Sequence, residues 1–153
     1  MMLELHNVSI GRLISSLSLT VEDGRLLCLT GAEGAGKTTL LRAVMGFLPI
    51  DEGHISIDGE LLTPKSAPYF RRQMAYVPQL LTVPDDYPLD TRYVSLLTHA
   101  VESHKPLLIV DEPPQQLSQE DAMLVDGLLT EASQKGTTIL AVNGRVQSKR
   151  VTL

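Results

Sequence analysis

The sequence predicts an α/β fold in which a mostly parallel core sheet is layered with helices, and a small antiparallel β subdomain stands at the N-terminus. Strand-like and helix-like patterns alternate from residue 25 onward, which is typical of parallel strands joined by right-handed crossovers. Residues 107–110 form a continuous apolar run, as in a strand buried on both faces of a parallel sheet. At 153 residues, of which 43% are hydrophobic and 20% charged, the chain is expected to form a single domain, 1–153.

The expected strands follow from two kinds of pattern. Residues 3–8, 16–21 and 53–59 alternate roughly between apolar and polar, which predicts strands with one solvated face. Core strands are expected at residues 25–30, 74–77, 107–110 and 137–142, with the last of these as the final strand of the core. Cys28 is the only cysteine and is expected to be a small core residue.

Three helices are predicted from apolar residues at helical spacing. The first begins at Gly36 and is ended by Pro49, and the second has Asp90 as its N-cap. The third is capped by Ser118 and ends before Gly136. Their apolar stripes are Leu40, Leu41, Val44, Met45 and Leu48 in the first, Val94, Leu97 and Val101 in the second, and Leu124, Val125, Leu128, Leu129 and Ala132 in the third.

A glycine-rich segment joins the strand at 25–30 to the first helix. It reads Gly31-x-x-x-x-Gly36-Lys37-Thr38. Such a loop between strand and helix binds phosphate, because glycines let backbone N–H groups turn inward at a helix N-terminus where the dipole favours an anion. The alternative is a turn needed only for folding, which the flanking strand and helix patterns disfavour.

The residues of this loop have separate expected roles. The nucleotide-binding residues are predicted to be Gly31, Glu33, Gly34, Ala35, Gly36, Lys37, Thr38 and Thr39. Lys37 would reach the outer phosphates, Thr38 would place its hydroxyl on Mg²⁺, and Thr39 would hydrogen-bond an inner phosphate.

Two carboxylates follow the apolar run at 107–110. Asp111 would hold Mg²⁺ through water, and Glu112 would polarise the attacking water. Acids at strand ends are common turn formers, but ligands of parallel sheets bind at the carboxyl ends of the strands. The glycine loop and these acids are therefore expected to converge on one site.

The composition argues against several other classes of function. A net charge of −5 disfavours a nucleic-acid partner, since binding to the phosphate backbone requires clustered Lys and Arg. No apolar stretch is long enough for a membrane span, and residues 1–8 lack the order of a signal peptide, so a cytoplasmic location is expected. The four histidines show no ligand spacing, so the only metal expected is Mg²⁺ carried by a nucleotide.

The order of these motifs resembles the ATP-binding subunit of ABC transporters. The matching segments are LELHNVSI, TGAEGAGKTTLL as Walker A, PIDEGHISIDG, RRQMAYVPQ with the Q-loop glutamine, PLLIVDEPP as Walker B, and TTILAVNGR at the switch position. Together they cover nearly the whole chain. The resemblance implies a three-layer P-loop NTPase fold, ATP as the nucleotide with Mg²⁺, and Gln79 as a catalytic and Mg²⁺-binding residue.

The interval between the Q-loop and Walker B departs from the family pattern. Residues 80–110 leave room for a loop and one helix, whereas the family has a helical subdomain and an LSGGQ signature there. The chain therefore resembles a truncated cassette whose helical subdomain is deleted between about residues 80 and 90. The sequence DYPLD, residues 86–90, stands in the place of the signature. Without the signature, this chain is not expected to complete a partner's site in the usual way.

Three smaller departures concern the nucleotide. Asn143 aligns with the family's switch histidine and would keep only a hydrogen-bonding role among the catalytic residues. The aromatic residue that stacks on adenine, expected around residues 10–12, is absent, which lowers the expected affinity for the base. Glu33 adds a negative charge within the phosphate loop.

These observations leave two functional hypotheses. The first is Mg-ATP binding with weak or partner-dependent hydrolysis, related to transporter ATPase subunits and supported by Glu112. The second is a non-hydrolysing nucleotide-binding module with a regulatory or structural role, supported by Asn143 and the missing signature. A P-loop kinase or GTPase is disfavoured, because the sequence has neither an Asn-Lys-x-Asp motif nor an arginine-rich lid.

The expected partners follow from the same pattern. Besides a nucleotide, we expect a homodimer or a complete ABC cassette subunit, with Leu96 and Ala100 on an exposed apolar contact face. A transmembrane partner is doubtful, because one wall of the groove that receives it in the family is missing. A peripheral position at the inner face of a membrane is the alternative to a purely cytoplasmic one.

Overall fold

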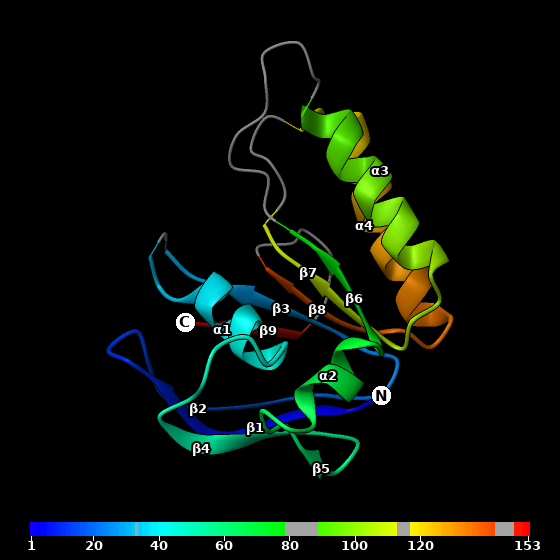
Figure 1. Cartoon of the computed structure of the whole chain (residues 1–153). Coiled ribbons are helices and arrows are strands. Elements are labelled where there is room, and N and C mark those ends of the chain that lie inside the picture. Colours follow the sequence, from blue (N-terminus) through cyan, green and yellow to red (C-terminus); the bar gives the residue numbers. More distant parts are fainter. Residues whose placement is uncertain (33, 79–88, 113–116, 143–148) are drawn as a thin grey trace.

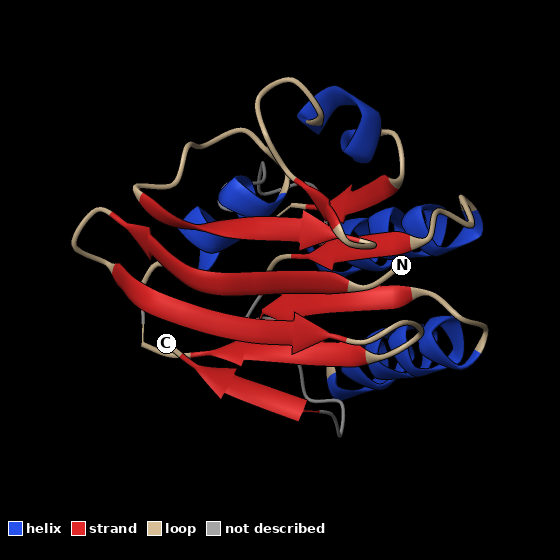
Figure 2. Ribbon diagram, turned by 90° about the horizontal axis from the view of Figure 1, so that it is seen from below, coloured by secondary structure: helices blue, strands red, loops and turns tan. Residues whose placement is uncertain are grey.

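The computed structural model describes residues 1–32, 34–78, 89–112, 117–142 and 149–153 (Figure 1). Two sheets lie one above the other with α1 between them, and α3 and α4 cover the far face of the parallel sheet. Figure 2 shows the strands crossing the molecule, with helices behind them. This is the predicted α/β architecture.

The N-terminal sheet is antiparallel, as predicted. Its order is β2-β1-β4-β5, and its strands are β1 (Leu3–Ile10), β2 (Ile14–Val21), β4 (Glu52–Ile57) and β5 (Glu60–Leu61). Leu3, Leu5, Val8 and Ile10 of β1 are buried, so one face of the sheet lies on the core, and the alternation shifts by one residue between Leu5 and Val8, where the strand register is irregular.

The core sheet is parallel in every pair and has the order β6-β7-β8-β3-β9. Its strands are β3 (Leu26–Thr30), β6 (Met74–Val77), β7 (Leu107–Val110), β8 (Thr138–Val142) and β9 (Lys149–Thr152). The prediction that residues 137–142 form the last core strand is wrong, because β9 adds a further strand beside β3. As an edge strand, β9 carries charged residues, and these hid its strand pattern in the sequence.

The helices are α1 (Lys37–Val44), α2 (Ala67–Arg71), α3 (Leu89–Glu102) and α4 (Gln119–Gln134). The short helix α2 was not predicted. The prediction that the second helix has Asp90 as its N-cap is also wrong, since α3 already includes Leu89.

The first helix ends earlier than predicted. It stops at Val44 because Gly46 adopts a left-handed conformation with φ of 79°. The N–H groups of Phe47 and Gly46 then donate to the carbonyls of Arg42 and Ala43, a Schellman-type ending that satisfies the last turn. Met45 and Leu48 therefore lie outside the helix, although Met45 is still buried.

The two faces of the parallel sheet form two cores. In β3, Leu27 and Leu29 pack toward α1 and the antiparallel sheet, whereas Leu26 and Cys28 pack toward α3 and α4. Cys28 is fully buried, as predicted.

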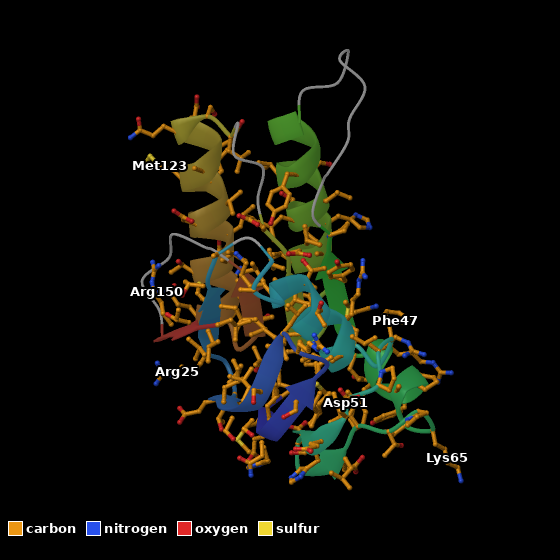
Figure 3. All side chains as sticks on the ribbon, turned by 90° about the vertical axis from the view of Figure 1, so that its left-hand side faces the viewer. Arg25, Phe47, Asp51, Lys65, Met123 and Arg150 are labelled. Atoms are coloured by element: carbon orange, nitrogen blue, oxygen red, sulfur yellow. The ribbon has the colours of Figure 1, made fainter. Side chains whose placement is uncertain are left out.

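The predicted stripe of α4 needs one correction. Val125, Leu129 and Ala132 are buried, but Leu124 is 51% exposed. Its neighbour in the sequence, Met123, is 68% exposed and lies on the outer side of the helix (Figure 3). Within the part of the chain that the structure describes, no helix has the length and apolar character to cross a membrane.

Candidate functional site

The glycine loop connects the end of β3 to the start of α1. Gly31, Gly34 and Gly36 all have positive φ, of 153°, 80° and 97°. Gly36 is the N-cap of α1 in a left-handed conformation that L side chains rarely adopt. The backbone therefore turns sharply at the point where the helix dipole favours an anion.

Two of these glycines also lie in crowded surroundings. A Cβ on Gly36 would lie 3.2 Å from Leu13 Cβ and from Ile14 Cγ1, at the turn between β1 and β2. A Cβ on Gly31 would lie 3.1 Å from the carbonyl oxygen of Leu153, just after β9. The loop is thus held between the antiparallel sheet and the edge of the parallel sheet.

Lys37 closes the loop. Its side chain is 8% exposed, and Nζ donates a hydrogen bond of 2.6 Å to the carbonyl oxygen of Gly31. This places a positive charge across the loop at the N-terminus of α1. The combination of an ammonium group, a helix N-terminus and a left-handed glycine turn fits the phosphate chain of a nucleotide.

The acidic end of the site lies at the end of β7. Thr38 Oγ1 donates to Asp111 Oδ2 at 3.2 Å, and the backbone N–H of Glu112 donates to Asp111 Oδ1 at 2.8 Å. A hydroxyl and a carboxylate are oxygen ligands of the kind that Mg²⁺ takes beside a nucleotide, so these residues fit the expected ion. Clusters of three or more His, Cys, Asp and Glu that could hold a metal are absent from the described residues.

Asp111 is 1% exposed, and its burial raises the pKa of the carboxyl group above the usual value. The hydrogen bonds from the Glu112 N–H and from Thr38 act in the opposite direction, because they stabilise the carboxylate. A buried acid of this kind, hydrogen-bonded to the residue that follows Lys37, is typical of a functional site.

Tyr93 was missed in the sequence. Its side chain is fully buried, and its hydroxyl donates to the carbonyl oxygen of Asp111 at 2.8 Å. The available signal was its position one turn before Leu97 on the buried stripe of α3. Burial raises the pKa of Tyr93, with smaller contributions from the charges of Asp111 and Glu112, so the hydroxyl keeps its proton.

The hydrogen bond between Thr38 and Asp111 thus brings the start of α1, which includes Lys37, to the end of β7, where Glu112 follows Asp111. Ala35 lies within the loop, where its N–H donates to the Ala32 carbonyl at 3.1 Å, and Thr39 lies in the first turn of α1. Glu33, Gln79 and Asn143 lie outside the described residues, as do residues 86–88 of the DYPLD segment.

The sequence pattern that defines the ABC transporter family matches residues 14–91. The Fe(3+) ions import ATP-binding protein FbpC 2 of Pectobacterium atrosepticum is 44% identical over 84 residues, which are 51% of this chain and 24% of that protein. The match therefore spans only about a quarter of that relative's length.

Solved structures share the fold at low sequence identity. A nucleotide-free ATP-binding cassette from an ABC transporter superposes with a TM-score of 0.78 at 16% identity, covering 94% of this chain and 81% of that one. A dimeric ATP-binding cassette in a post-hydrolysis state, bound to ADP and Pi, gives 0.69 at 17% identity, with 92% and 87% covered.

Proposed function

Because this chain belongs to the ABC transporter family, we propose that it binds Mg-ATP in the glycine loop and hydrolyses it weakly, or only with a partner subunit. The hydrogen bond between Thr38 and Asp111 carries this proposal. It brings a hydroxyl and a carboxylate to the same end of the loop that Lys37 crosses.

The loop residues would bind the phosphates. The ammonium of Lys37, which now donates to the Gly31 carbonyl, would donate instead to the outer phosphate oxygens. Gly31, Gly34 and Gly36 would direct backbone N–H groups toward the same oxygens, as would Glu33. The N–H of Ala35, which now donates to the Ala32 carbonyl, would have to exchange that bond for one to a phosphate oxygen. Thr39, in the first turn of α1, would bond an inner phosphate.

The bound Mg²⁺ would neutralise charge on the phosphates, and Thr38 and Asp111 would hold it, with Gln79 as a further ligand. Glu112 follows Asp111 directly and would accept a proton from the attacking water. Asn143 would hydrogen-bond near the outer phosphate. Loss of one charge-stabilising contact typically lowers the rate by about 10² to 10⁵. The missing signature and switch histidine would therefore affect turnover far more than binding.

The alternative is a nucleotide-binding module without hydrolysis. Two sequence features favour it: Asn143 at the switch position, and DYPLD where the family has its signature. In this case Glu112 would have no catalytic role, and nucleotide would only change the affinity for a partner.

The partner is proposed to be a second copy of the chain or a complete ABC cassette subunit. The relative FbpC 2 is named an import ATP-binding protein, and one structural relative is a dimer. We propose that this chain acts as a single domain without the helical subdomain. It would work in the cytoplasm or peripherally at the inner face of a membrane, with a transmembrane partner as the less favoured case.

Calorimetric titration with Mg-ATP tests binding first. The comparison is wild type, Lys37→Ala, and Lys65→Ala as a matched lysine control, since Lys65 is exposed at the far end of the molecule from α4 (Figure 3). Binding that is lost only in Lys37→Ala is expected, and no binding of the wild type at millimolar ATP would refute the proposal.

Phosphate release from the same samples then separates the two functions. Slow release that disappears in Glu112→Gln supports the ATPase, whereas binding without release, also in the presence of a complete ABC cassette, supports the module.

A further inference from the structure

One peptide group at the acidic end of the site is fixed on both sides. It joins Asp111 to Glu112, its carbonyl accepts the hydroxyl of Tyr93 at 2.8 Å, and its N–H donates to Asp111 Oδ1 at 2.8 Å. The other carboxylate oxygen, Oδ2, accepts from Thr38. Three hydrogen bonds thus connect helix α3, the end of β7 and the start of α1.

We propose that Tyr93 is a positioning residue for the nucleotide site: its hydroxyl fixes the Asp111–Glu112 peptide and so directs the Asp111 carboxylate toward Thr38. The inference rests on the proposed function and deepens it, because it gives α3 a role in placing the Mg²⁺-binding group.

The packing of Tyr93 makes its hydroxyl a rigid donor. The ring is fully buried in the core between α3, α4 and the parallel sheet, in the same cluster as Leu97 and Val110. A side chain whose rotamer is locked by packing holds its hydrogen-bonding group in place, which is what a supporting residue of a site requires.

Loss of the Tyr93 hydroxyl should change the orientation of the Asp111–Glu112 peptide while the fold is retained. Tyr93→Phe keeps the buried ring but leaves the Asp111 carbonyl without this donor. Because a buried carbonyl without a donor is unfavourable, the peptide should reorient and its N–H bond to Asp111 Oδ1 should loosen.

The first test needs no nucleotide. It compares the exchange rate of the Glu112 amide with that of Leu108, a core amide of the preceding strand β7, in wild type, Tyr93→Phe and Leu97→Val. We expect the exchange rate of Glu112 divided by that of Leu108 to be about tenfold higher in Tyr93→Phe than in the wild type. Leu97→Val disturbs the same core one turn further along α3 but keeps the hydroxyl, so its ratio should remain that of the wild type.

The second test measures how much Mg²⁺ improves ATP binding, as the ratio of the dissociation constants in EDTA and in Mg²⁺. This ratio should fall about tenfold in Tyr93→Phe and stay unchanged in Leu97→Val and in Tyr69→Phe, which removes an exposed hydroxyl on α2.

A Tyr93→Phe variant that matches Leu97→Val in amide exchange overturns the inference, and so does an unchanged Mg²⁺ ratio. If the wild type binds no ATP, the proposed function fails, while the exchange comparison still decides whether Tyr93 fixes the peptide.

Discussion

Thr38 and Asp111 are joined by a hydrogen bond of 3.2 Å although 73 positions separate them in the chain. Thr38 is the second residue of α1, and Asp111 follows the last residue of β7. The bond therefore links the start of a helix to the end of a strand. Parallel strands deliver such residues to one edge of the sheet. The bond therefore reports whether the loop and the acidic end of the site are assembled.

Replacing the Thr38 hydroxyl should weaken binding of Mg-ATP specifically. Thr38→Val keeps the shape but removes the oxygen, whereas Thr38→Ser keeps the oxygen. We expect Thr38→Val to bind Mg-ATP about tenfold more weakly than Thr38→Ser, with a smaller difference in EDTA, because the hydroxyl is needed for the ion rather than for the phosphates. Calorimetry with and without Mg²⁺ measures both values, and equal affinities of the two variants would contradict the assigned role.

Asp111→Asn should make the metal-free protein more stable at neutral pH. Because burial raises the pKa of Asp111, the folded state binds this proton more tightly than the unfolded state, and ionisation at higher pH costs stability. Asparagine avoids that cost. The gain in melting temperature should therefore be present at pH 8 and shrink as the pH falls toward about 4, the ordinary pKa of an aspartate.

Thermal unfolding of both proteins in EDTA across this pH range measures the effect. A difference between the two proteins that does not change with pH would show that ionisation of Asp111 is not its cause. Under the proposed function, Mg-ATP should reverse the order, since it stabilises only the protein that can hold the ion.

The glycine loop and the acidic end of β7 could each be predicted from the sequence, because each is marked by a pattern of neighbouring residues. Glycine spacing marks the loop, and an apolar run that ends in two acids marks the end of β7. Their meeting follows from the rule that ligands of parallel sheets bind at the carboxyl ends of the strands. The alternation of strands and helices likewise predicted the parallel sheet before its order was known.

The remaining features depend on contacts that no local pattern records. Tyr93 donates to a backbone carbonyl. Every residue has such a carbonyl, so no sequence pattern marks the one that accepts this bond. The end of α1 is set by Gly46, where an added Cβ would lie 2.5 Å from the Cβ of Ala67 in α2. Strand β9 forms by pairing with β3. Its own sequence is short and charged, so the sequence pattern alone does not indicate a strand.

Gly36→Ala and Gly34→Ala should separate crowding from backbone strain. Both positions have positive φ, of 97° and 80°, so each alanine pays about 1–2 kcal/mol for a left-handed conformation. Only at Gly36 would the new methyl group also meet Leu13 and Ile14, at 3.2 Å, whereas nothing among the described atoms lies within 4 Å at Gly34. Gly36→Ala should therefore lose more stability.

Urea unfolding of the two variants gives the comparison directly. A Gly34→Ala variant that is as destabilised as Gly36→Ala, or more so, would mean that the turn between β1 and β2 does not press on the loop. Nucleotide binding would be compared at equal fractions of folded protein, so that a folding defect is not mistaken for a lost contact.

Leu96→Glu tests the predicted contact face on α3. Leu96 is 36% exposed, whereas Ala100 is partly buried and packs against the core, so Leu96 is the residue of this pair that a partner would meet. If a second copy covers this face, the wild type should be larger than a monomer in light scattering, and Leu96→Glu should dissociate it, because a buried unpaired carboxylate is costly. Met123→Glu is the matched control, since Met123 is 68% exposed on the outer side of α4. Dissociation by both variants would point to a general effect of added charge, and a monomeric wild type would rule out self-association through α3.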